Sequence, residues 1–316
     1  MCLFRRALAP LLALLLATPV MAAPALWRFG DEDTTIYLFG TIHALPPGYN
    51  WRDARIDRAI ERSDTLVIET VIDKDPTVFA RLFPPPDPSL PPILERVPPD
   101  TRKAFAARLR KSSIDPSSLD RMPTWQAAFV LMGSMMKDLG IKRDAGVETN
   151  ISKSFERAPT DGGAPRTVEG LETPGSQLAL FADLSEADQR ELLISMVSGQ
   201  GDARRDYVKM LGAWANGNQL KIARAFEDDK DLTPHLREVL LRRRNENWAQ
   251  WLKARLAKPG TIFVAVGAGH LAGPISVQSF LAAEGIRIQR IYAHSGHRSA
   301  AAKVPSNQRA RSASRR

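Results

Sequence analysis

The chain has 316 residues, of which 44% are hydrophobic and 25% charged, and these values exclude a disordered or membrane-embedded chain. The length is enough for one large or two small domains with a buried core. The net charge of +9 falls to +1 once two arginines near the start and six cations after residue 293 are set aside, so the body gives no support for a nucleic-acid partner.

The first 22 residues have the pattern of a secretory signal peptide. Two arginines precede the apolar run from Leu8 to Val20, and small residues precede Ala23. The run is shorter than the roughly 20 residues that span a bilayer. We therefore expect cleavage near residue 22, no membrane span afterwards, and a periplasmic or secreted protein. Cys2 is the only cysteine and would leave with the signal peptide, which excludes disulfides and thiolate ligands from the mature chain.

After the signal peptide, strands and helices alternate. Short apolar runs predict strands and periodic runs predict helices. The predicted strands are 36–39, 65–68, 167–171, 261–266 and 287–292, and the predicted helices between them include 52–62 and 275–283. This alternation predicts an α/β (α+β) fold with a mixed, largely parallel central sheet flanked by helices.

The middle of the chain is predicted to be helical. The segments with helical spacing are 100–111, 124–139, 148–156, 185–198, 206–227 and 234–257. We expect them to form helical insertions at about residues 76–165 and 185–258 of a single domain spanning residues 24–293. Residues 294–316 are rich in Ser, Ala and Arg, contain no acidic residue, and are predicted to be a disordered basic tail.

Four polar residues directly follow predicted strands. They are His43, Glu69, Glu172 and His270. Ligands of open α/β sheets bind at the carboxyl ends of the strands. If these strands are parallel neighbours, two imidazoles and two carboxylates converge on one edge.

Imidazole and carboxylate groups suit a divalent ion such as Mn, Co or Zn. Glycines at Gly40 and Gly267 open the two Gly-x-x-His segments and allow a tight turn after each strand. A lone histidine after a strand is more often structural than a ligand. The recurrence of one spacing, with acids in matching places, favours a metal or catalytic site, in which a spare glutamate would serve as general base.

The segment from Gly267 to Gly273 also approaches a dinucleotide-binding loop. Its glycine spacing is G-x-G-x-x-x-G rather than G-x-G-x-x-G, and the next predicted strand ends at Tyr292 without an acid for a ribose. Few residues of the body remain to continue a nucleotide domain. The metal site is therefore the preferred interpretation.

Several segments in the same order resemble the TraB/GumN family. They are Tyr37–His43, Leu66–Glu69, Gly170–Thr173, the pair Arg244 and Asn245, and Val266–Gly273. The resemblance covers about residues 27–292. It implies an α/β core shared with Tiki-type, erythromycin-esterase-like and ChaN-like proteins. Tiki-type proteins are metal-dependent peptidases that require Mn or Co.

The resemblance also implies residue roles. His43 and His270 would be metal ligands, with Glu69 and Glu172 as ligand or base. Arg244 and Asn245 would point at the site and hold a substrate carbonyl or acidic group. Glu148 stands where relatives are expected to have aspartate, which leaves its role open.

These observations predict an exported, metalloprotease-like hydrolase that depends on a divalent metal and acts on a peptide or protein substrate. The alternative is a non-catalytic periplasmic binding or accessory protein that keeps the pocket. The sequence leaves the metal, the substrate and the oligomeric state open, and it does not distinguish a helical lid from a separate domain.

Overall fold

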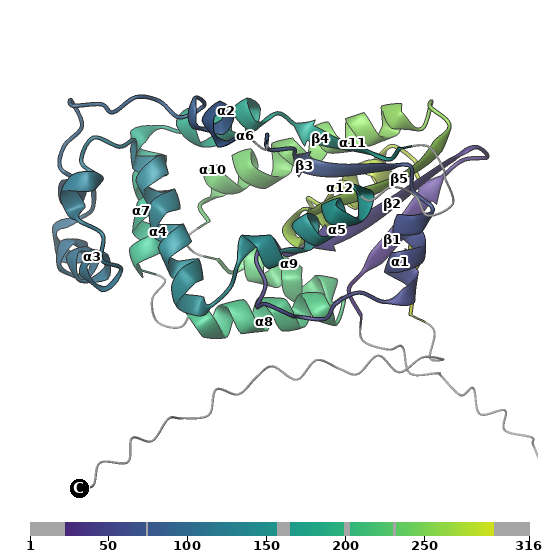
Figure 1. Ribbon diagram of the computed structural model, residues 1–316, viewed down its shortest axis with the longest axis horizontal. Helices are drawn as coiled ribbons and strands as arrows, with labels where there is room; N and C mark the ends of the chain where they lie inside the picture. Colours follow the sequence, from purple (N-terminus) through teal and green to yellow (C-terminus); the bar gives the residue numbers. More distant parts are fainter. Residues whose placement is uncertain (1–22, 74, 157–164, 199–202, 230–231, 294–316) are drawn as a thin grey trace, which may run out of the picture.

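The computed structural model describes residues 23–73, 75–156, 165–198, 203–229 and 232–293. The predicted signal peptide and basic tail lie outside these ranges. One sheet contains the strands β1 (Leu26–Gly30), β2 (Thr34–Thr41), β3 (Thr65–Thr70), β4 (Thr167–Glu172), β5 (Gly260–Gly267) and β6 (Gln289–Ile291). Their order across the sheet is β4-β3-β5-β2-β1-β6 (Figure 1).

Four neighbouring strands of this sheet are parallel. β2 pairs with β5, β5 with β3, and β3 with β4, all in parallel, whereas β1 is antiparallel to both β2 and β6. The predicted mixed, largely parallel sheet is confirmed. Thr41 lies opposite Gly267, and Thr70 lies opposite Glu172. The carboxyl ends of these strands therefore finish level with one another at one edge.

Helices cover both faces of the sheet, which explains the continuous apolar run of β5. Phe263 packs on one face against α1 (Ala54–Glu61), α5 (Val147–Glu156), α8 (Ala203–Ala215) and α9 (Gln219–Glu227). Val264 packs on the other face against α11 (Arg243–Arg255) and α12 (Val277–Ala283). Alternate residues of one buried strand thus belong to two separate apolar clusters.

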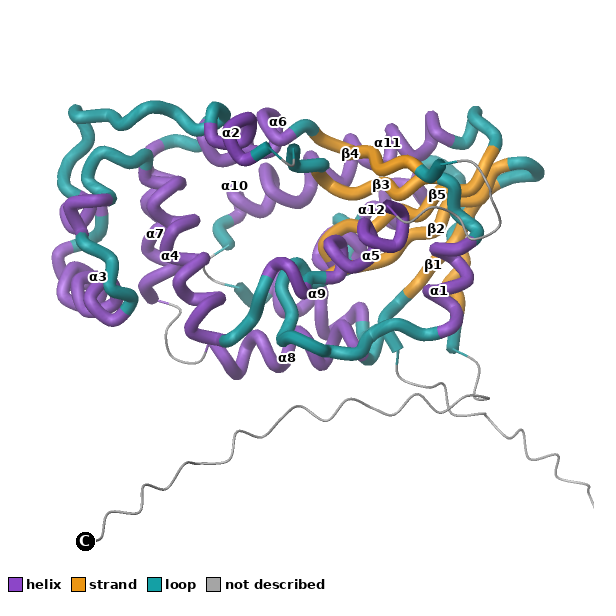
Figure 2. Tube along the Cα trace, in the orientation of Figure 1, coloured by secondary structure: helices purple, strands orange, loops and turns teal. Residues whose placement is uncertain are grey.

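A second body of helices lies beyond the carboxyl edge of the sheet (Figure 2). Phe105, Leu131 and Leu193 join α3 (Pro99–Lys111), α4 (Thr124–Leu139) and α7 (Glu186–Ser198) in an apolar cluster of their own. The remaining helices are α2 (Pro76–Ala80), α6 (Pro174–Ala182) and α10 (Pro234–Arg237), with short 3-10 helices at Ile93–Arg96, Pro116–Ser118, Arg143–Ala145 and Ala268–Leu271 and a π-helical turn at Glu238–Arg242. No helix within the described ranges is long and apolar enough to cross a membrane.

Two sequence predictions need correction. Residues 206–227 were predicted as one helix, but α8 ends at Ala215 and Gly217 takes a left-handed conformation with φ 58°. The side chain of Asn218 then caps α9 by accepting a hydrogen bond from the Lys221 N–H. Strand β1 was not predicted, because it is only five residues long and Arg28 interrupts its apolar run.

Candidate active site at the carboxyl edge of the sheet

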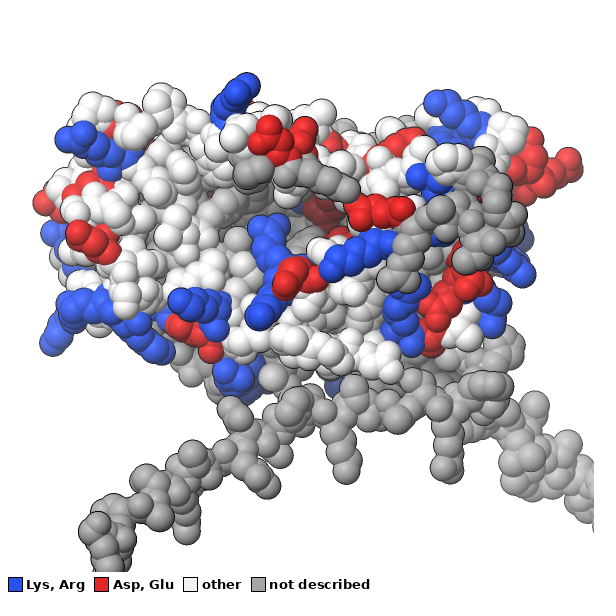
Figure 3. Space-filling model, in the orientation of Figure 1, with Lys and Arg blue, Asp and Glu red and all other residues white. Residues whose placement is uncertain are grey.

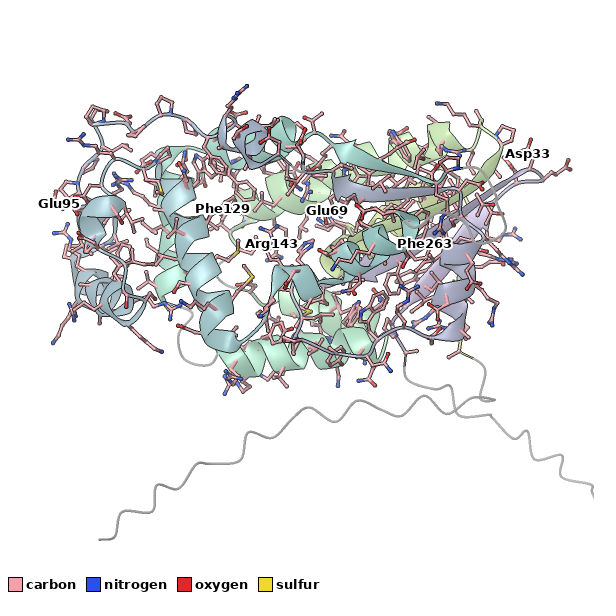
Figure 4. The ribbon with its side chains drawn as sticks, in the orientation of Figure 1. Asp33, Glu69, Glu95, Phe129, Arg143 and Phe263 are labelled. Carbon is pink, nitrogen blue, oxygen red and sulfur yellow. The ribbon has the colours of Figure 1, made fainter. Side chains whose placement is uncertain are left out.

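Each of the four polar residues predicted from strand ends lies at the carboxyl edge. Glu69 and Glu172 belong to the last residues of β3 and β4, and His43 follows β2 by two residues. His270 lies in the short 3-10 helix after β5. Glu69 lies at the end of β3 that points toward α4 (Figure 4). In the space-filling view, acidic and basic side chains meet around a hollow between the sheet and the helical body (Figure 3).

Glu69 is the central group of the site. Its Oε1 accepts a hydrogen bond from the Gly267 N–H at 2.8 Å, and its Oε2 lies 2.8 Å from Arg244 Nη2. Burial alone would raise the pKa of this carboxyl, but His270, His43 and Arg244 outweigh it and lower the pKa to about 2. The carboxylate is therefore ionised and faces two imidazoles at neutral pH.

His43 is oriented by an acid on α5. Its Nδ1 lies 2.6 Å from Glu148 Oε1, and its Nε2 lies 3.9 Å from Glu69 Oε1. The Thr41 hydroxyl donates to the same Glu148 oxygen. Glu148 raises the pKa of His43 to about 9. The His43 side chain is 58% exposed, so a ligand can reach its ring from the solvent side.

His270 is oriented by an amide on α11. Its Nδ1 lies 2.6 Å from Asn245 Oδ1, and the Asn245 amide nitrogen donates to the Ile275 carbonyl at 2.7 Å. That second bond fixes the amide so that its oxygen faces the ring, which places the ring proton on Nδ1. Burial lowers the pKa of His270 to about 3. The Nε2 therefore carries the lone pair, and it lies 3.2 Å from Arg244 Nη1 and 3.8 Å from Glu69 Oε1.

Arg244 links the acids of the site. Its Nε and Nη2 bind the two oxygens of Glu172 at 2.7 and 2.9 Å, and its Nη1 lies 3.2 Å from His270 Nε2. The Trp248 indole lies under the guanidinium, 4.7 Å from its Cζ, and donates to Glu172 at 3.1 Å. Its neighbours Arg242 and Arg243 have side chains 45% and 63% exposed, whereas the Arg244 side chain is only 11% exposed. Arg244 therefore belongs to the site and not to a solvated basic face.

Gly40 and Gly267, the two glycines singled out in the sequence, allow neighbouring groups of the site to lie close to the backbone. A Cβ on Gly40 would lie 3.1 Å from the Ala268 Cα. A Cβ on Gly267 would lie 3.1 Å from Glu69 Oε1 and 3.2 Å from His43 Nε2. The missing side chain of Gly267 thus leaves a small space between the imidazoles and Glu69.

Sequence reasoning missed Trp248 and Gln177. Trp248 was identifiable in principle, because it follows Arg244 by one helical turn and must share its face. Gln177 on α6 approaches Glu69 Oε2 at 3.4 Å. No short motif predicts this role for Gln177, because its contact with Glu69 depends on how α6 packs near the end of β3. Asn245 is fully buried beneath His270 and so orients that ring instead of meeting a substrate.

The donor set suits a divalent ion, although the described residues contain no group of three or more His, Cys, Asp or Glu already in metal-holding geometry. Both Nε2 atoms lie within 4 Å of one Glu69 oxygen, beside the space left by Gly267. One contact opposes an ion, because Arg244 Nη1 lies against His270 Nε2. An ion held by both rings would therefore have to take the place of this arginine contact.

The fold and site define an α/β protein with paired histidines and glutamates at the carboxyl edge of a parallel sheet. The chain belongs to the TraB/PrgY/gumN family, whose model matches residues 25–290. It is similar to the uncharacterized protein YbaP of Escherichia coli K12 and to its Shigella flexneri counterpart. Each is 24% identical over 241 residues, which cover 75% of this chain and 84% of the relative. No solved structure matches the chain.

Proposed function

We propose that the chain is an exported metal-dependent hydrolase that cleaves peptide bonds. One observation carries the proposal. Each site histidine has its Nδ1 bound to an acceptor, Glu148 or Asn245, and directs its Nε2 toward Glu69. Metal-binding histidines are held in this way, since the outer contact fixes both the tautomer and the ring orientation.

The proposed ion is held by His43, His270 and Glu69. When bound, a divalent ion of the Mn, Co or Zn type polarises a carbonyl and makes hydroxide available near neutral pH. Glu69 suits this role because its pKa of about 2 keeps it ionised. His43 contributes the solvent-facing side of the site, since its ring is more than half exposed.

Arg244 and Glu172 are the proposed substrate-handling pair. Arg244 donates to Glu172, Glu69 and the Leu240 carbonyl and lies against His270 Nε2. A substrate carbonyl or carboxylate would take over one of its N–H groups. Glu172 is the acid not needed to hold the ion, and we assign it as proton acceptor. Trp248 holds this pair, because its ring packs against the Arg244 guanidinium and its indole N–H donates to Glu172.

The peptide substrate and the location rest on further arguments. The peptide assignment follows from the resemblance to Tiki-type peptidases. Export follows from the predicted signal peptide at residues 1–22. Together these two arguments lead us to propose a periplasmic or secreted hydrolase.

A second candidate function is a non-catalytic binding or accessory protein. It is favoured by the closed contacts of Arg244, which satisfy Glu69, Glu172 and His270 without any ion. In that case the arginine would bind an anionic ligand and no bond would be cleaved.

Metal content and peptide cleavage separate the two functions. The purified protein is stripped with a chelator, incubated with Mn, Co or Zn, and analysed for bound metal, then assayed on a peptide library. We expect about one ion per chain and ion-dependent cleavage. His43→Ala and His270→Ala should lose the ion, while the control His235→Ala, with a half-exposed side chain, should keep it. Unchanged metal content in both site variants would refute the metal site, and metal without cleavage would favour the accessory protein.

A further inference from the structure

A cavity of about 470 Å³ lies apart from the histidine site, between α1 and the strands β2, β1 and β6. Figure 1 shows α1 beside β1, away from the carboxyl ends of the strands. Five arginines line it, and its described lining contains no acidic residue; the arginines are Arg28, Arg55, Arg58, Arg62 and Arg290. It shares no residue with the histidine site, so the inference below is independent of the proposed function.

The strand register and the helix repeat explain why these arginines converge. Arg28 of β1 lies opposite Tyr37 of β2 on one side and Gln289 of β6 on the other. These residues form the floor of the cavity. Arginines at positions 55, 58 and 62 are spaced three and four residues apart, so they line one side of α1 and form the wall.

Most of this positive charge is not neutralised. Arg55 is the exception, since its guanidinium lies 2.7 Å from Asp53 and also donates to two backbone carbonyls. Among the described residues, Arg290 donates a hydrogen bond only to the Gly217 carbonyl, at 2.7 Å. The described part of the chain offers no ion pair or side-chain hydrogen bond to Arg28, Arg58 or Arg62. Four cations thus surround one cavity and give it a positive potential that attracts an anion.

A tyrosine hydroxyl adds a polar anchor to the cavity. Tyr37 is only 6% exposed, and its ring packs on Phe263 at 6.4 Å. Its hydroxyl has no hydrogen-bond partner among the described residues and is open to the cavity. The ring is fixed by the core, so the hydroxyl is held in the lining as a donor for a ligand oxygen.

We infer that this cavity binds a phosphate-bearing ligand with at least two negative charges. The arginine fork matches the geometry of phosphate oxygens, and its charge does not depend on pH. A phosphate group carries about 1.5 to 2 negative charges at pH 7, so one group offsets about half of the four unpaired cations, and a ligand with two phosphates offsets most of them. The cavity volume is within the range of small-molecule sites.

The same phosphate chemistry exists in free compounds and in lipid headgroups, and two probes distinguish these sources. Calorimetry with pyrophosphate tests a free ligand. Flotation with phosphatidic acid vesicles, whose headgroup is a phosphate monoester, tests a lipid headgroup by comparison with phosphatidylcholine vesicles. We expect saturable binding of the full chain to at least one of these phosphate probes.

Variants then test whether the binding occurs in this cavity. The double variant Arg58→Gln and Arg62→Gln should bind the active probe at least about tenfold more weakly, since it removes two charge-assisted contacts. Tyr37→Phe should weaken binding several-fold with an unchanged melting temperature. The matched control, Arg110→Gln with Arg121→Gln, removes two exposed arginines of the helical body and should bind normally.

Three results would overturn the inference. They are the absence of binding to both probes, an equal loss in the control variant, and tighter binding of citrate than of pyrophosphate. The last result would show that the cavity selects carboxylates.

Discussion

Arg244 and Glu172 form a two-pronged ion pair, with the arginine Nε 2.7 Å from one carboxylate oxygen and its Nη2 2.9 Å from the other. Their side chains are only 11% and 13% exposed. The same Nη2 also reaches Glu69 at 2.8 Å. The Arg244 guanidinium is therefore the shared counter-charge of two buried carboxylates. Together, Arg244, Glu69 and Glu172 have a net charge of about −1, which would attract a further cation.

Replacing Arg244 with glutamine should destabilise the metal-free protein by about 3–5 kcal/mol, because two buried carboxylates lose their counter-charge. Urea unfolding of the chelator-treated protein measures this change. Added Mn should restore part of the lost stability, since a divalent ion supplies positive charge at the same place. The control is Arg242→Gln in the adjoining π-helical turn, with a side chain that is 45% exposed, and it should change stability by no more than about 1 kcal/mol. A loss that Mn does not reduce would contradict the shared-charge explanation.

Replacing Gly267 with alanine should weaken metal binding while the fold is retained. The new Cβ would lie 3.1 Å from Glu69 Oε1 and 3.2 Å from His43 Nε2, so it would fill the space between the proposed ligands. The φ of Gly267 is −50°, so alanine causes no backbone strain there. We expect the melting temperature to change little and the affinity for Mn to fall at least about tenfold.

The matched control for this variant is Gly133→Ala in α4. A Cβ there would meet nothing within 4 Å, and alanine in a helix is more stable than glycine by about 0.5–1 kcal/mol. Metal affinity should be unchanged. If Gly267→Ala binds Mn as tightly as the parent, the ion does not occupy the space beside Gly267.

Much of the fold was predictable because buried parallel strands have continuous apolar runs. The predicted strand 261–266 matches β5 to within one residue at each end. The predicted helix 124–139 has the same bounds as α4. The antiparallel strand β1 was not predictable in this way. Its identity as a strand depends on pairing with β2 and β6, which no local pattern encodes.

The candidate site was predictable to the extent that strand ends define it. His43, Glu69, Glu172 and His270 each follow a recognisable strand, and parallel pairing brings them to one edge. The outer contacts required the tertiary structure. Which acid meets His43 depends on how α5 packs, and Glu148 lies 105 residues further along the chain.

Replacing Asn245 tests the orientation of His270. Asn245→Ala removes the acceptor for the ring Nδ1–H and should lower the affinity for Mn about 10- to 100-fold. Asn245→Asp keeps an acceptor for the ring but loses the bond to the Ile275 carbonyl, so it should be less stable yet retain most of the metal affinity. Calorimetry with Mn and thermal unfolding measure both effects. Equal metal affinity of the alanine and aspartate variants would show that the contact with the ring is unimportant.

Metal binding should release about one proton per ion at pH 7.5. The pKa of His43 is about 9 in the metal-free protein, so its ring is protonated on both nitrogens at this pH and must lose one proton to bind an ion. His270, with a pKa of about 3, is already neutral and releases none. The release should therefore decline as the pH rises through 9. Calorimetry with Mn in two buffers of different ionisation enthalpy measures it.

Glu148→Gln identifies the source of that proton. The variant removes the charge that raises the pKa of His43, so the pKa should return toward 6.5 and the release at pH 7.5 should fall to about one tenth of a proton. Glu61→Gln on the exposed side of α1 is the control and should release as much as the parent. A parent protein that releases no proton would mean that His43 is neutral before the ion binds, and the Glu148 contact would then serve only to orient the ring.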